Sequence, residues 1–301
     1  MIPPCLTLKG TVGICSPSHI ALPGNYERIR DVLCRKGFSV VEGDNLYKDT
    51  DGYLASPHER ADDFNRLIAD PDVELVFFGG GEGSVELIPY IDFDNIRRHP
   101  KCILSYSDGT TILNTIWSRT GLETYYGQSP HMFMDLRSYD YDQFVSHLVN
   151  RDAGRHVSDS SWQVQTQGKA EGILVGGYSR NFALLLGSPS FLWSPEEQYV
   201  LFLEDHERFG GVDYVSAMLS NIEQQPFFRR VTGLLFGRYS DDPHPFLLHR
   251  LERLGQEWEI PVVYCGDFGH NSESGRGGGH AILPIGRRVR LETERCILRY
   301  L

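Results

Sequence analysis

A serine, a glutamate and a histidine stand in this chain at places suited to acyl-transfer chemistry. Ser107 follows a short apolar stretch and precedes an apolar-periodic segment beginning at Thr111, a pattern typical of a strand, a sharp turn and a helix. Such a turn exposes a hydroxyl at a helix N-terminus, where free N–H groups stabilise developing negative charge. The spacing Ser105-x-Ser107-x-Gly109 is close to the G-x-S-x-G nucleophile elbow. A serine before a helix is also a common N-cap, so this segment alone leaves both interpretations open.

Two later segments supply the other groups that a serine nucleophile needs. The apolar run 199–203 ends in Glu204 and Asp205, and the run 262–265 leads into Asp267 and His270. Acyl transfer needs a base to take the proton of the nucleophile and a carboxylate to orient that base. Strand ends of α/β proteins hold such side chains rigidly beside a cleft. Ser107, Glu204 and His270 therefore form a candidate triad, although a solvated strand end and an ordinary loop histidine would explain the last two equally simply.

Other titratable residues compete for these roles. His280 precedes an apolar strand and is expected to be structural, whereas His270 ends its own strand and is the preferred base. Asp205 and Asp267 are alternative carboxylates. Asp108 lies too close in sequence to the serine to orient a distant histidine, and its charge suits the first turn of a helix.

The periodicity along the chain predicts an α/β protein with two domains. Residues 1–150 alternate strands and helices, which indicates a parallel-sheet domain of flavodoxin or Rossmann type that carries the nucleophile. Residues 151–168 have the composition of a linker. Residues 169–301 form a second, smaller α/β domain with Glu204 and His270, and the active site is expected at the domain interface.

The predicted elements can be given by range. In the first domain they are strands at Gly10–Cys15, Ser39–Glu42 and Val73–Phe78 and helices at Tyr26–Lys36 and Pro57–Ala69. In the second they are strands at Glu171–Val175, Val200–Glu204, Val231–Phe236, Val262–Cys265 and Arg288–Glu292, with helices at Val212–Ile222 and Phe246–Trp258.

Composition excludes several classes of function. The 301 residues carry a formal net charge of −11, with no basic run longer than two residues, so nucleic-acid binding has little electrostatic support. No apolar run is long enough to span a membrane, and the N-terminal residues lack the pattern of a signal peptide. The six cysteines are scattered, which favours reduced thiols over disulfides or a zinc site. A cytoplasmic protein is expected.

The glycine-rich segment Gly79–Gly83 follows a predicted strand. It lacks the G-x-G-x-x-G spacing of a dinucleotide site and the G-K-[ST] of a P-loop, so no nucleotide cofactor is expected. A loop that lets backbone N–H groups approach a substrate carbonyl explains the same glycines. No metal-binding motif of the H-E-x-x-H type occurs, and no metal is expected.

These motifs together resemble one family of enzymes. Ser105-Tyr-Ser107-Asp108 resembles the Gly-Tyr-Ser-Asp nucleophile motif of the LD-carboxypeptidase family of serine peptidases, which includes muropeptide LD-carboxypeptidases and microcin C immunity carboxypeptidases. Further segments match that family in the same order along the chain: Val12–Ser18, Phe77–Gly83, Leu87–Asp92, Thr120–Gly127, Leu201–Asp205, Phe268–His270 and Leu283–Gly286.

The resemblance implies a role for each matched residue. Ser107 would be the nucleophile, His270 the general base and acid, and Glu204 the carboxylate that fixes the histidine tautomer. The oxyanion hole would consist of backbone N–H groups of Asp108 and of the glycine loop, at Gly80 and Gly81. The resemblance also implies a homodimer, no cofactor, and a small peptide-like substrate, either an LD-muropeptide or an aminoacyl-nucleotide antibiotic conjugate.

Three segments depart from the family pattern. Ser105 replaces a glycine, Gly176–Asn181 contains an apparent insertion, and Asn271–Gly279 is long and rich in glycine. The segments Gly127–Asp135, Tyr178–Arg180 and Asn271–Gly279 are expected to select the substrate, and Gly127–Asp135 looks closer to the immunity branch. The alternatives are a non-catalytic protein that binds a small polar ligand in an interdomain cleft, and a general α/β-hydrolase esterase.

Overall fold

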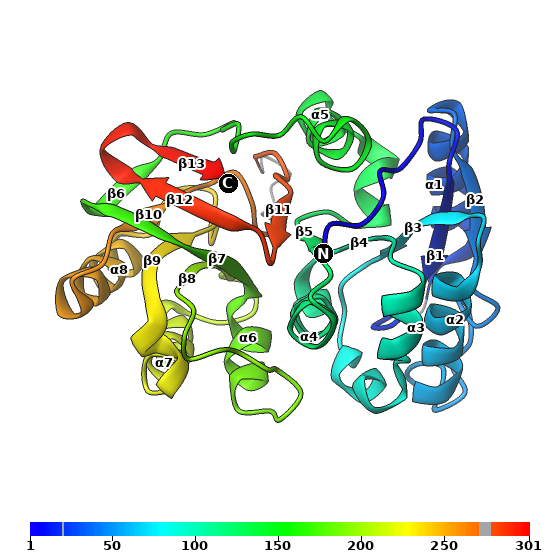
Figure 1. Cartoon of the computed structure of the whole chain (residues 1–301), viewed down its shortest axis with the longest axis horizontal. Coiled ribbons are helices and arrows are strands. Elements are labelled where there is room, and N and C mark those ends of the chain that lie inside the picture. The colour runs from blue at the N-terminus through cyan, green and yellow to red at the C-terminus, as the bar shows by residue number, and fades with distance from the viewer. Residues whose placement is uncertain (20, 271–277) are drawn as a thin grey trace. The chain divides into compact units, whose positions relative to one another are not determined.

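The computed structural model describes residues 1–19, 21–270 and 278–301 of the chain (Figure 1). It divides into two compact units, Met1–Asp152 (unit 1) and Ala153–Leu301 (unit 2). Unit 2 is slightly shorter than unit 1. Each unit buries its own sheet between helices, as the alternation of strand and helix patterns predicts.

Unit 1 is built on a parallel sheet whose strands β1 to β5 have the order β5-β4-β3-β1-β2. This is the flavodoxin-like order, in which the direction of winding reverses between β1 and β3. The carboxyl ends of those two strands form the usual ligand-binding place of such sheets. The strands are β1 (Thr11–Cys15), β2 (Ser39–Glu42), β3 (Val73–Phe78), β4 (Cys102–Ser105) and β5 (Thr124–Tyr126).

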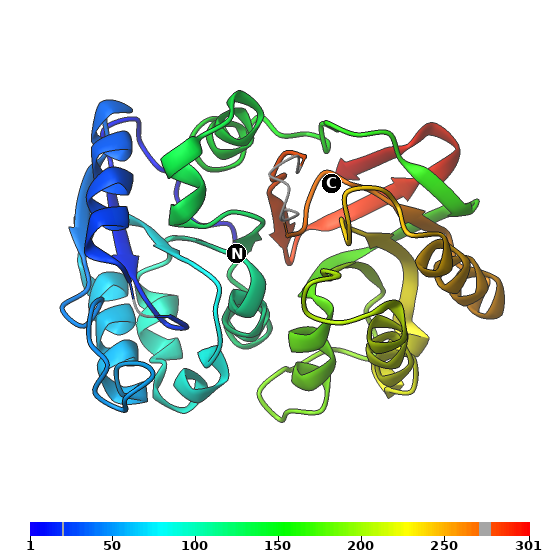
Figure 2. The same cartoon turned by 180° about the vertical axis from the view of Figure 1, so that it is seen from behind.

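The helices of unit 1 are those that link and cover these strands, seen from the two sides in Figures 1 and 2. Helix α2 begins with a capping box, in which Ser56 and Glu59 satisfy each other's backbone N–H groups. The helices are α1 (Pro23–Arg35), α2 (Pro57–Ala69), α3 (Phe93–Arg98), α4 (Thr110–Thr120) and α5 (Ser138–Phe144), with 3₁₀ turns at Ser84–Tyr90, Ser107–Gly109 and Pro130–Asp135 and a π-helical turn at Val145–Asn150.

Unit 2 contains a mixed sheet with the order β13-β12-β7-β8-β9-β10-β6 among the described residues. Its central strands β7, β8, β9 and β10 are parallel, and antiparallel strands flank them on both sides. The strands of this sheet are β6 (Gln163–Thr166), β7 (Lys169–Tyr178), β8 (Tyr199–Glu204), β9 (Val231–Phe236), β10 (Val262–Tyr264), β12 (Arg288–Glu292) and β13 (Ile297–Tyr300). The short strand β11 (Leu283–Ile285) is not part of it. The helices are α6 (Ser179–Leu186), α7 (Val212–Glu223) and α8 (Pro245–Trp258).

The strands that carry the candidate site residues are completely buried. Every residue of β4 and β8 is buried, because helices cover both faces of the parallel strands. The side chains at the ends of these strands are therefore held by rigid backbone.

The structure adds elements that the sequence patterns did not reveal. The polar segment 151–168, expected to be a linker, contains β6, which pairs antiparallel with β10. An exposed edge strand needs little apolar sequence, which explains why its composition resembles a linker. The apparent insertion at Gly176–Asn181 is the junction of β7 and α6.

Candidate active site

Ser107 lies on a sharp turn between β4 and α4. Its φ is +57°, in the left-handed region that residues other than glycine rarely adopt. Its backbone N–H donates to Tyr126 Oη at 3.1 Å, and its carbonyl accepts from Thr110 Oγ1 at 2.7 Å. A serine held in this strained conformation between a strand and a helix has the geometry of a nucleophile elbow.

The glycine loop packs directly against this turn. A Cβ added to Gly80 would stand 2.5 Å from Ser107 Cβ, so only glycine fits there. Asp108 links the two segments, because its carboxylate accepts from the Ser84 N–H at 2.8 Å and its carbonyl accepts from Ser84 Oγ at 2.8 Å. The Asp108 side chain therefore holds the loop in place.

The turn also explains why a serine can replace the family glycine at position 105. Ser105 is the fully buried last residue of β4 and needs no left-handed backbone. The close approach is made instead by Gly109, where an added Cβ would lie 2.2 Å from Ser105 Oγ.

A cavity of about 520 Å³ lies at the carboxyl ends of β1 and β3, where the winding of the sheet reverses. His19 on its wall bonds Tyr26 Oη at 2.8 Å, and burial lowers the pKa of its imidazole to about 4. It is therefore neutral near pH 7. The residues lining the cavity are Ser18, His19, Tyr53, Leu54, Glu82, Gly83 and Glu86.

In unit 2, His270 and Glu204 form a hydrogen-bonded pair. His270 Nδ1 lies 2.8 Å from Glu204 Oε2, and the backbone N–H of His270 donates to the same oxygen at 3.4 Å. Glu204 is fully buried, whereas the His270 side chain is 13% exposed. A carboxylate that accepts from Nδ1–H leaves the lone pair of the neutral imidazole on Nε2, as a general base requires.

Aromatic and carboxyl groups surround this pair. Tyr178 lies directly beside Glu204 in the register of β7 and β8, and its ring centroid is 5.2 Å from that of His270. The Phe209 ring lies against the imidazole at 5.4 Å between centroids. Asp205 instead bonds Ser179 Oγ and the His206 N–H, and burial raises the pKa of its carboxyl group to about 6.

His280 has a different environment from His270. Only 2% of its surface is exposed. Of the segment Asn271–Gly279 that was expected to shape the substrate site, residues 271–277 lie outside the described residues.

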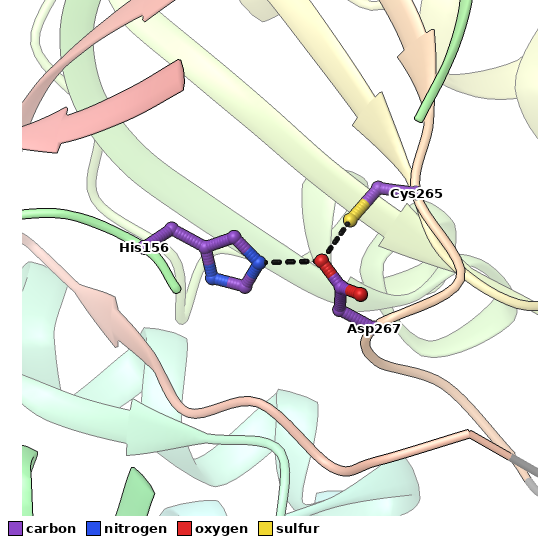
Figure 3. Close-up of side chains that lie close together, drawn as sticks. All are labelled: His156, Cys265 and Asp267. Atoms are coloured by element: carbon purple, nitrogen blue, oxygen red, sulfur yellow. Dashed lines mark hydrogen bonds and ion pairs between the residues drawn. The ribbon is translucent and has the colours of Figure 1, made fainter. Parts of the chain in front are cut away.

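Asp267, the other rival carboxylate, is the centre of a separate buried cluster (Figure 3). Its Oδ2 lies 2.7 Å from His156 Nε2 and 3.1 Å from Cys265 Sγ, and it also accepts from Ser158 Oγ at 2.6 Å and Trp162 Nε1 at 3.1 Å. Burial raises the pKa of this carboxyl group, but the hydrogen bonds from His156 and Ser158 outweigh it and hold the pKa well below its usual range.

This cluster brings together the three donor types that zinc accepts, His156, Cys265 and Asp267, within 4.8 Å of one another. Four donors already converge on a single carboxylate oxygen, however, and burial keeps the Cys265 thiol protonated by raising its pKa. The arrangement is that of a hydrogen-bond cluster that ties the segment before His270 to residues 156–162.

Two contacts at the serine turn were not found from the sequence, the hydrogen bonds of Tyr126 and of Ser84. Tyr126 and Ser84 look like ordinary strand and loop residues, and only the fold brings them to the serine.

Comparison with known sequences identifies the family of the chain. The profile of the LD-carboxypeptidase N-terminal domain matches residues 12–127, and that of the LD-carboxypeptidase C-terminal domain matches residues 171–291. The chain belongs to the LD-carboxypeptidase family. It is an enzyme of the serine carboxypeptidase type.

Two curated relatives illustrate the breadth of the family. A Vibrio cholerae protein, provisionally named a carboxypeptidase, is 30% identical over 267 residues, 78% of each chain. The microcin C7 self-immunity protein MccF of Escherichia coli is 28% identical over 270 residues, covering 78% of this chain and 77% of its own.

Solved structures share the fold over almost the whole chain. The structure of MccF in complex with glutamyl sulfamoyl guanosine has a TM-score of 0.85 at 24% identity and covers 99% of this chain and 97% of its own. A muramoyltetrapeptide carboxypeptidase from Oxalobacter formigenes has a TM-score of 0.79 at 20% identity and covers 96% of this chain and 97% of its own.

Among the described residues, no helix is long and apolar enough to cross a membrane.

Proposed function

We propose that this enzyme hydrolyses an amide bond through a Ser107–His270–Glu204 triad and an acyl-enzyme intermediate. Ser107 Oγ attacks the carbonyl carbon of the substrate while His270 Nε2 accepts the hydroxyl proton. Glu204 accepts from Nδ1–H, holds the imidazole in the required tautomer and stabilises the imidazolium that forms.

The remaining steps follow from the same groups. The tetrahedral oxyanion accepts hydrogen bonds from backbone N–H groups of Asp108 and of Gly80 or Gly81. His270 then donates its proton to the leaving nitrogen, the C–N bond breaks, and an ester with Ser107 remains. Water attacks this ester with His270 as base, which releases the carboxylic acid and restores the serine hydroxyl.

The observation that carries the proposal is the left-handed backbone of Ser107 at the junction of a strand and a helix. A structural N-cap serine has an extended backbone, so capping does not account for this strain. The His270–Glu204 hydrogen bond supports the assignment of the base and its orienting carboxylate.

We further propose a small peptide-like substrate from one of two classes, an LD-linked muropeptide or an aminoacyl-nucleotide conjugate. The basis is likeness to relatives: one solved neighbour is named a muramoyltetrapeptide carboxypeptidase, and another holds an aminoacyl sulfamoyl nucleoside. A hydrolysable amide beside a compact polar group is common to both classes.

The test is product mass spectrometry after incubation with an LD-terminated muropeptide and, separately, with an aminoacyl-nucleotide conjugate. Cleavage of one substrate by the wild type and not by Ser107→Ala supports the mechanism and decides the class. Cleavage that survives in Ser107→Ala would exclude the serine mechanism. Binding of both substrates without cleavage, equal in the two proteins, would favour a binding protein.

A homodimer and a cytoplasmic location remain predictions. Light scattering coupled to gel filtration should give twice the mass of the 34.2 kDa chain. A monomer at micromolar concentration that retains full activity would contradict the dimer. Cell fractionation tests the location.

A further inference from the structure

Arg238 is a buried residue at the carboxyl end of β9, between the strand that carries Glu204 and the strand that leads to His270. Only 4% of its surface is exposed. Its guanidinium donates to the backbone carbonyls of four residues in the segments 266–270 and 278–279. These are Gly266 at 2.6 Å, Gly279 at 2.9 Å, Gly269 at 3.3 Å and His270 at 3.4 Å.

The main chain of Arg238 contacts the same loop. Its N–H donates to Phe268 O at 2.7 Å, and a Cβ added to Gly269 would stand 2.8 Å from Arg238 O. Gly269 has φ +113°, a conformation that favours glycine and permits this approach. On the other side, the preceding Gly237 N–H donates to Leu203 O at 2.7 Å, next to Glu204. Gly237 and Arg238 together thus join the backbone on both sides of the His270–Glu204 pair.

A guanidinium is suited to this place and an ammonium is not. Removing a cation from water costs several kcal/mol, and only a full set of hydrogen bonds offsets that cost. The planar fork of arginine presents five donors in fixed directions, whereas lysine concentrates its three donors on one nitrogen. Lysine at position 238 would keep the charge but could not reach carbonyls that lie on different sides of the fork.

We propose that Arg238 is a positioning residue that acts through His270. By holding the carbonyls of Gly269 and His270, it sets the imidazole at hydrogen-bond distance from Glu204. The inference rests on the proposed role of His270 as general base. Arg238 itself takes no part in bond making or breaking.

The first variant to test is Arg238→Lys, with Arg250→Lys as the matched control. Arg250 is also a buried arginine of unit 2, 6% exposed, but it bonds Ser216 Oγ and Glu223 on the helical side. Both variants should lose thermal stability, and only Arg238→Lys should misplace the histidine. Its kcat is expected to fall about 10- to 100-fold, because small displacements of a catalytic group carry costs of that order, while KM changes little.

A proton NMR signal provides a readout that needs no substrate. The Nδ1–H of His270, bonded to a buried carboxylate, should give a downfield resonance that is absent in His270→Gln. We expect this resonance to shift or disappear in Arg238→Lys and to persist in Arg250→Lys. If no substrate is ever cleaved, the proposed function fails but the resonance still decides the role of Arg238.

Two results would overturn the inference. One is an Arg238→Lys protein with an unchanged resonance and wild-type kcat. The other is equal loss of resonance and activity in both arginine variants, which would show only a general loss of stability.

Discussion

Gly80 and Ser107 are in direct contact, and the distance of 2.5 Å from a Cβ at position 80 to Ser107 Cβ leaves no room for any side chain. Gly80→Ala should therefore displace the nucleophile or the loop. We expect kcat to fall about 100-fold, since a shift of about 1 Å at a reacting group has effects of that size. Steady-state kinetics checks this, with Gly24→Ala as control, because a Cβ at Gly24 meets open space. Similar activity in the two variants would contradict the close packing.

The backbone strain at Ser107 should lower the stability of the folded protein by a measurable amount. Its φ of +57° costs roughly 1 kcal/mol or more for a residue with a Cβ, and glycine does not carry that cost. Ser107→Gly and Ser107→Ala should both be inactive. Ser107→Gly should be more stable than Ser107→Ala by about 1 kcal/mol, or a few degrees in Tm. Differential scanning calorimetry of the two variants makes the comparison. An equal Tm would mean that the turn relaxes without strain.

Glu204→Gln should leave the fold intact and remove most of the activity. The amide keeps the shape of the side chain but no longer selects the required tautomer of His270 or stabilises its charged form. By analogy with serine triads, kcat should fall about 10³- to 10⁴-fold with little change in KM. The neighbouring Asp205→Asn, whose carboxylate bonds Ser179 and the His206 N–H, should lose less than about tenfold in kcat. A larger loss in Asp205→Asn than in Glu204→Gln would reverse the assignment of the orienting carboxylate.

Asp205 should also make stability depend on pH. Burial raises the pKa of its carboxyl group from 3.8 to about 6, so the folded protein binds this proton more tightly than the unfolded chain does. The resulting contribution to the free energy of unfolding is fully present below about pH 4. It is lost as pH rises through 6, a change on the order of 1–3 kcal/mol. Asp205→Asn should lack this loss, which chemical denaturation at pH 4.5 and pH 7 would detect. Identical pH dependence in wild type and variant would contradict the raised pKa.

Asp267 should make stability depend on pH in the opposite direction to Asp205. Its folded-state pKa lies below the usual value, because hydrogen bonds from His156 and Ser158 outweigh the effect of burial. Its stabilisation is therefore present above about pH 4 and is lost as pH falls towards the folded pKa. Asp267→Asn places an amide N–H₂, which is itself a donor, among the donors of the cluster. The free energy of unfolding, measured with urea at pH 7, should therefore fall by about 3 kcal/mol.

The same cluster distinguishes a hydrogen-bond role from a metal role. If the four donors to Asp267 Oδ2 are structural, adding zinc to the purified protein should leave its Tm unchanged. A Tm that rises with zinc in the wild type and not in Cys265→Ala would instead indicate metal binding by His156, Cys265 and Asp267.

Much of the fold follows from local patterns. The strands Ser39–Glu42 and Val73–Phe78 and the helix Pro57–Ala69 have the predicted bounds, because their apolar periods and capping residues are local signals. The candidate residues Ser107, Glu204 and His270 were also found locally, since each follows an apolar strand and has side-chain chemistry suited to a triad. Short elements such as β5 and β6 were missed, because three or four residues contain too little periodicity to identify a strand.

The sequence by itself thus determined the family, the order of the main elements and the residue types of the site. Only the tertiary structure shows the φ of Ser107 and the hydrogen bond between His270 and Glu204, and only its contacts suggest the role proposed for Arg238. These features depend on contacts between residues far apart in the chain, such as Arg238 and Gly279. No local pattern encodes them, because the energy of each contact depends on how distant segments pack around it.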